Sequence, residues 1–211
     1  MKIVLYNDLL NLKKTLIKLV FFILIFSGVQ IMMVDNLGMG LGFPFLILSM
    51  TSLNVFYFSD VSRSDLYIMA LGARKKDFVA ARYLLSLLFV GVGFVISLIL
   101  FALSSYKGLI SSGEYFFGIS LIFSFSLVWM GLSLPIYFKY DFSKARSMVV
   151  FIYSLIFFIS FFLSSQLDMA GSVSKFVDSN VGPITMISIF IGIVFYYLSY
   201  IISKRMVKNK Y

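Results

Sequence analysis

The sequence predicts an all-α membrane protein with six transmembrane helices, and three observations support this prediction. Of its 211 residues 61% are hydrophobic and 13% are charged, against ~25% charged residues in soluble domains. The chain contains six apolar runs, each near the ~20 residues that cross a hydrocarbon core. Sixteen of the 18 Lys and Arg residues lie in alternate gaps between these runs, and Lys107 and Lys175 are the exceptions.

The gaps between the apolar runs predict the topology. The runs cover residues 17–34, 43–59, 83–104, 116–138, 147–165 and 182–202. The cations lie in the N-terminal segment, the loops after the second and fourth runs, and the C-terminal tail, which the positive-inside rule places in the cytoplasm. We therefore expect a multi-pass protein of the bacterial cytoplasmic membrane with both termini inside. No gap is long enough for a soluble domain, so residues 1–211 are expected to form a single transmembrane domain.

Two shorter helices are expected on the cytoplasmic side. In residues 1–16, leucines recur at helical spacing (Leu5, Leu9, Leu12 and Leu16), while Asn7, Asp8 and Asn11 lie on other faces. This pattern predicts a helix lying in the membrane interface. The alternative is that this segment simply extends the first span. The loop after the second span contains an N-cap signal at Ser64, an apolar face and a closing Gly72, which together predict a short helix.

Missing residue types exclude most enzyme chemistry in this chain. It has no His and no Cys, so Ser-His triads, Cys-His pairs and His-ligated zinc or haem sites cannot form. The acids do not repeat at metal-ligand spacing, and no G-x-x-x-x-G-K-[ST] phosphate loop is present. No span has an ionisable group in its middle, where ion-coupled carriers usually need one. We expect neither an enzyme nor a chain with its own metal or cofactor, and any uphill transport must draw energy from another polypeptide.

Polar residues within the apolar runs are mainly serines, and they suggest a translocation path. The candidates are Ser49, Ser52 and Asn54 in the second span and Ser124 and Ser126 in the fourth. Hydroxyl groups can line a narrow wet path, whereas the alternative is that Ser lets two helices approach closely. Trp129 and the tyrosines near span ends are interpreted as membrane anchors, namely Tyr83, Tyr115, Tyr137, Tyr196 and Tyr200.

Three segments resemble motifs of small ABC-2 type permeases of bacterial ABC transporters. Residues 134–146 read LPIYFKYDFSKAR, similar to the signature LPLxFKFGxEKAR. Residues 5–14 (LYNDLLNLKK) resemble the N-terminal LxKDLxxxKK, and residues 71–83 (LGARKKDFVAARY) resemble the loop LPVSRKxIVxAKY. Gly72-Ala73 and Asp141 depart from these patterns. The three motifs occur in the expected order on one side of the membrane.

The resemblance implies the transmembrane subunit of an ATP-driven exporter. Such a subunit pairs with a second permease copy or a related permease, and each copy docks on a separate ABC ATPase that holds ATP and Mg²⁺. The implied coupling residues are Tyr67, Leu71, Arg74, Lys75, Phe78 and Arg82. Lys139, Lys144 and Arg146 are implied as a second contact or a lipid headgroup clamp. For each cation, a pure topology signal is the competing interpretation.

The cargo is less constrained by the sequence. The chain has 25 Phe and 11 Met residues, which can repack against varied apolar surfaces and suit an amphipathic or hydrophobic cargo. Some permeases of this type export membrane-active peptides, so the resemblance favours that class. The alternative function is a membrane immunity or sensor protein that binds a toxic peptide without transporting it and without an ATPase.

Overall fold

The computed structural model describes residues 1–33, 37–70, 72–106, 112–166 and 181–209, and every regular element in these ranges is an α-helix. The all-α fold class is therefore confirmed. The elements are α1 (Lys2–Met33), α2 (Leu37–Ser62), α3 (Ser64–Ala70), α4 (Lys75–Tyr106), α5 (Ser112–Lys139), α6 (Phe142–Gln166) and α8 (Val181–Asn209).

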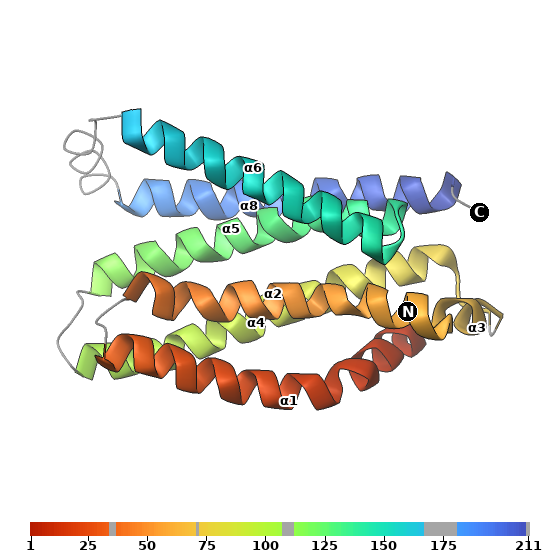
Figure 1. The fold of residues 1–211 in the computed structure, drawn as a ribbon, viewed down its shortest axis with the longest axis horizontal. Helices are drawn as coiled ribbons and strands as arrows, with labels where there is room; N and C mark the ends of the chain where they lie inside the picture. Colours follow the sequence, from red (N-terminus) through yellow and green to blue (C-terminus); the bar gives the residue numbers. More distant parts are fainter. Residues whose placement is uncertain (34–36, 71, 107–111, 167–180, 210–211) are drawn as a thin grey trace.

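The long helices lie side by side in one elongated bundle, with α3 at one end (Figure 1). The N-terminus, the C-terminal end of α8 and α3 all lie at this same end, which we call the α3 end. It also carries the loop between α5 and α6 and therefore gathers the segments in which the cations concentrate. The positive-inside rule predicts that the α3 end faces the cytoplasm.

Four described segments are long and apolar enough to cross a membrane: Gly42–Ser62, Lys75–Leu100, Phe117–Lys139 and Gly182–Val207. The other two predicted spans fall largely in α1 and α6. In α1 the apolar stretch Thr15–Val29 is shorter, whereas α6 has 25 residues, which at 1.5 Å per residue is about 38 Å. The length and composition of these helices support the assignment as a multi-pass membrane protein. The count of six spans stays a prediction.

The separate interfacial helix predicted for residues 1–16 is not present. These residues form the first half of α1, one continuous 32-residue helix that curves along its length (Figure 1). No Gly or Pro interrupts the chain before Gly28, so the backbone hydrogen bonds have no reason to break there. Val4, Asp8 and Leu12 are all buried, and their spacing of four residues puts them on one packed face of α1. The segment is thus continuous with the helix of the first span, and its placement in the membrane interface stays a prediction.

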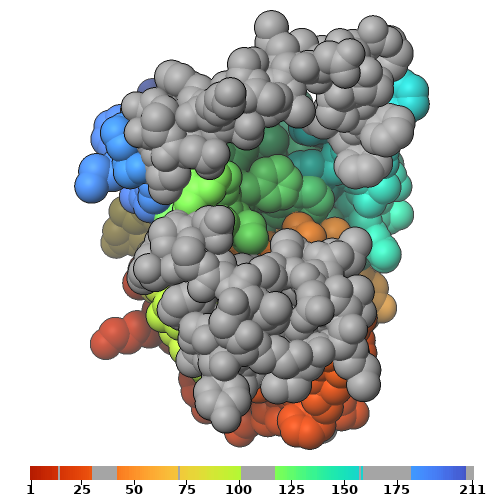
Figure 2. All heavy atoms as spheres, turned by 90° about the vertical axis from the view of Figure 1, so that its left-hand side faces the viewer, coloured from red at the N-terminus to blue at the C-terminus, as the bar shows by residue number. Residues whose placement is uncertain are grey.

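Helix α5 lies at the centre of the bundle and packs most closely against α8. Seen from the end away from α3, α5 (green) is visible between α8 (blue) and α6 (cyan) (Figure 2). A methyl group on Gly192 of α8 would lie 3.2 Å from the Cα atom of Ser124 of α5, so glycine at this position lets the two backbones approach. Small residues at helix contacts are typical of membrane bundles.

Candidate functional site

The candidate site is the α3 end, where a short helix is placed between two sharp turns. Arg63, at φ 50°, joins α2 to α3, and Gly72, at φ 90°, follows α3. The closing role predicted for Gly72 is confirmed, because its N–H donates to the carbonyl of Met69 and its φ is left-handed. Ser64 begins the helix, but its buried hydroxyl has no hydrogen-bond partner, so its side chain does not cap α3.

Helix α3 has one packed face and one exposed face. Ile68 is buried in a small apolar cluster with Val4 of α1 and with Phe78 and Ala81 of α4. On the other side Leu66 is 55% exposed and Tyr67 is 71% exposed. Leu66 and Tyr67 therefore form an exposed apolar pair at the α3 end, a surface that suits contact with a partner.

The buried side chain of Arg82 on α4 links α3 to the long helices. Its guanidinium donates to both carboxylate oxygens of Asp65 of α3, each at 2.8 Å, and to the hydroxyl of Ser59 of α2. It also lies 4.4 Å from the ring centroid of Phe56 and 3.9 Å from a carboxylate oxygen of Asp8 of α1. The side chain is only 5% exposed. One buried cation therefore contacts α1, α2 and α3 from its place on α4.

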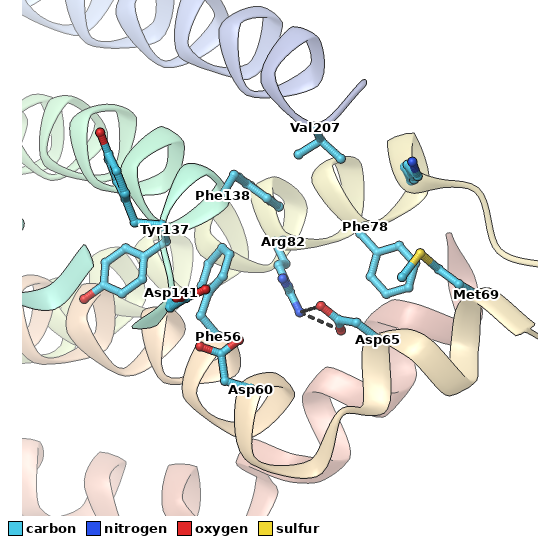
Figure 3. A pocket seen from close by; sticks show the side chains of 12 residues that line it. Phe56, Asp60, Asp65, Met69, Phe78, Arg82, Tyr137, Phe138, Asp141 and Val207 are labelled. Atoms are coloured by element: carbon cyan, nitrogen blue, oxygen red, sulfur yellow. Dashed lines mark hydrogen bonds and ion pairs between the residues drawn. The ribbon is translucent and has the colours of Figure 1, made fainter. Parts of the chain in front are cut away.

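These contacts border a cavity of about 130 Å³ (Figure 3). Arg82 and Asp65 face each other on one side of it, and Asp60, Asp141 and the aromatic rings of α2 and α5 lie around it. A cavity of this size has room for water beside the charged groups. In the described part of the chain no group of three or more acidic side chains is placed to hold a metal ion.

The carboxyl group of Asp8 is the most perturbed acid at this end. Burial raises its pKa to about 7, against the attraction of Arg82, which lowers it, and with a further increase from the charge of Asp65. One of its oxygens is buried without a hydrogen-bond partner. The folded protein therefore favours the neutral form of Asp8 below about pH 7.

This pKa predicts how stability depends on pH. The unfolded chain releases the Asp8 proton near pH 4, whereas the folded protein keeps it until about pH 7. The stabilisation is therefore complete at low pH and is lost as the pH rises through the folded pKa. We expect the melting temperature in detergent micelles to fall between about pH 4 and pH 7 and to level off above it, and to fall less in the Asp8→Asn variant, which cannot titrate there. Identical pH profiles for the two proteins would show that Asp8 does not titrate in this window.

The second predicted loop is also attached to α2. The carboxylate of Asp60 accepts a hydrogen bond of 2.8 Å from the backbone N–H of Phe142, the first residue of α6. The negative charge of this carboxylate also interacts favourably with the positive end of the α6 helix dipole. Lys139, Lys144 and Arg146 are exposed around this junction, as expected for a second contact or headgroup clamp.

The structure separates the six predicted coupling residues into two groups. Tyr67 and Arg74 are exposed and Lys75 is half-buried at the start of α4. Phe78 and Arg82 are buried, so their side chains lie inside the bundle rather than on the surface where a direct contact was predicted. Leu71 lies outside the described residues.

The predicted translocation residues are similarly divided. Ser49, Ser52, Ser124 and Ser126 are buried in the helix packing, and Ser52 donates to the carbonyl of Ser49 while Ser124 donates to the hydroxyl of Ser188 on α8. Their positions match the alternative in which serine permits close helix contacts. Asn54 instead lines a second cavity between α2, α5 and α6.

Several residues interpreted as membrane anchors lie inside the protein. Tyr83 is buried and its hydroxyl hydrogen-bonds those of Ser199 (2.6 Å) and Ser203 (2.8 Å) on α8. Trp129 is 9% exposed and stacks on Tyr153 of α6, with ring centroids 3.3 Å apart. The anchor interpretation is wrong for Tyr83 and Trp129. Asp8 and Asp65 are site residues that sequence reasoning missed, because carboxylates in loops and at helix ends normally face water.

A bundle of long apolar helices with its cations at one end defines a multi-pass membrane protein. The family model for ABC-2 family transporter proteins matches residues 4–208, and the chain therefore belongs to the ABC-2 transporter family. Members are membrane components of transporters that generally work with a separate ATPase subunit and are not themselves catalytic. No curated protein and no solved structure matches the chain.

Proposed function

We propose that this chain is the permease subunit of an ATP-driven exporter that moves an amphipathic or hydrophobic cargo, with membrane-active peptides the favoured class, out of the cell. It pairs with a second permease copy or a related permease, and each docks on a separate ABC ATPase that holds ATP and Mg²⁺. Membership of the ABC-2 family supports a permease-type subunit. The observation that carries the ATPase contact is the exposed apolar face of α3, Leu66 and Tyr67, at the basic end of the bundle.

The contacts behind α3 supply a route for coupling. A partner that moves α3 also moves Asp65, and Asp65 is held by two hydrogen bonds to Arg82 on α4. Arg82 contacts Ser59 on α2 and Asp8 on α1. Displacement of α3 is thereby passed to three long helices as a unit, because buried charged hydrogen bonds resist separation. ATP biases the permease between two states only if the ATPase contacts α3 differently in each.

Co-purification tests the proposed function. The affinity-tagged permease is co-expressed with each ABC ATPase of its source organism and purified in mild detergent. We expect one of these ATPases to be retained in stoichiometric amount, and its ATP hydrolysis rate to change on binding. A permease that melts cooperatively but retains none of them, and that protects cells from a toxic peptide when expressed alone, would contradict the proposal and favour the immunity function.

A further inference from the structure

A groove lies between α2, α5 and α6, and we call it the α6 groove. It has a volume of about 340 Å³. Leu53, Trp129 and Val149 lie buried along it, whereas Met50 on α2 and Val150 on α6 are more than half exposed. A groove with a buried apolar floor and exposed apolar rims on two adjacent membrane helices is accessible from the bilayer and has the surface that an acyl chain needs.

The α6 groove carries charge of one sign. Arg146, on the first turns of α6, is the one charged residue among the described residues that line it. Asp60 accepts its hydrogen bond from the backbone of Phe142, and it is not a lining residue of this groove. Arg146 is exposed at the α3 end, where the anionic headgroups of the cytoplasmic leaflet are expected. A guanidinium there recognises a phosphate group through paired hydrogen bonds.

The spacing of Arg146 and the apolar floor matches that of a lipid's phosphate group and its acyl chain. Tyr153 follows Arg146 by seven positions in α6, which corresponds to about 10 Å along the helix axis. Tyr153 stacks on Trp129, and both rings line the groove. A phosphate held at Arg146 therefore directs an attached chain past these rings.

We propose that the α6 groove binds an anionic phospholipid of the cytoplasmic leaflet, with the phosphate on Arg146 and an acyl chain along Leu53, Trp129 and Val149. Binding of this lipid does not require an ATPase. A failed ATPase experiment and a failed lipid experiment are therefore separate results, although transport of the lipid as cargo would rest on the proposed function.

Trp129 is the single Trp of the chain, which makes it a direct reporter of this groove. The full-length protein is reconstituted into vesicles of phosphatidylcholine or phosphatidylglycerol whose acyl chains carry bromine at mid-chain, where bromine quenches tryptophan fluorescence on contact. We expect brominated phosphatidylglycerol to quench Trp129 at least twofold more than brominated phosphatidylcholine, because the first lipid offers a net negative charge to Arg146.

Matched variants of the same loop assign the preference to the groove. Arg146→Gln should remove the preference, and Arg146→Lys should retain part of it. Outside this loop, Arg205→Gln removes an exposed arginine near the end of α8 that does not line the groove, and it should leave the preference unchanged. Equal quenching by the two lipids in the wild type, or a preference that survives Arg146→Gln, would overturn the proposal.

Discussion

Arg82→Ala should cause the largest loss of stability of any single substitution at the α3 end, about 3–5 kcal/mol. The substitution removes a buried cation and leaves Asp65 without its two hydrogen bonds and Asp8 without its neighbouring positive charge. The loss is costly because two hydrogen bonds between charged groups disappear, each contributing about 1.5–3 kcal/mol, and because the buried hydroxyl of Ser59 also loses its partner. For a chain of this size the melting temperature should fall by roughly 10 °C, as measured by thermal unfolding in detergent micelles.

Two further variants separate charge from geometry. Arg82→Lys keeps the positive charge but cannot place one nitrogen at Asp65 and Ser59 and another beside Asp8, as Nη2 and Nε of Arg82 do, so we expect an intermediate loss. Arg205→Ala removes an exposed arginine near the end of α8 and should change stability by less than about 0.5 kcal/mol. Equal melting temperatures for Arg82→Ala and Arg205→Ala would show that the buried contacts of Arg82 do not hold α3 in place.

The double substitution Leu66→Ala with Tyr67→Ala should weaken ATPase binding at least tenfold without unfolding the permease. Both side chains are exposed, so their truncation costs the fold little. In a complex they would be buried against the partner, where aromatic anchors contribute most of the binding free energy. A tenfold loss corresponds to about 1.4 kcal/mol. The measurement is the ATPase dissociation constant, alongside the melting temperature of the permease.

The matched control for this surface is Tyr197→Ala. Tyr197 is 61% exposed, against 71% for Tyr67, but it lies on the apolar part of α8, so ATPase affinity should not change. Unchanged affinity in the Leu66 and Tyr67 double variant, with a complex clearly present, would place the docking surface elsewhere.

The overall fold was largely predictable because it depends on properties that the sequence displays directly. The length of each apolar run predicts a helix that reaches across a bilayer, and the cation distribution predicts which ends lie together. The short helix before Gly72 was predictable for the same reason, since its apolar face and its closing glycine are local signals, although Ser64 does not form the predicted cap. Long-range partners are not needed for any of these inferences.

The site was predictable only in part because its contacts join distant segments. An aspartate such as Asp8 normally lies on a solvated helix face, and its burial here depends on α4, which brings Arg82 beside it from far along the chain. Arg82 occurs in a run of basic loop residues, and nothing local distinguishes it from exposed Arg74. Trp129 was assigned to the interface from residue type, whereas its stacking on Tyr153 depends on where α6 lies.

Site-specific photo-crosslinking tests most directly the claim that α3 carries the ATPase contact. A benzophenone side chain replaces Tyr67 in the full-length permease, and Tyr197 in the control, and each complex with the ATPase is irradiated. We expect a covalent adduct between permease and ATPase from position 67 and none from position 197. A complex that contains the ATPase but gives no such adduct from position 67 would contradict this assignment.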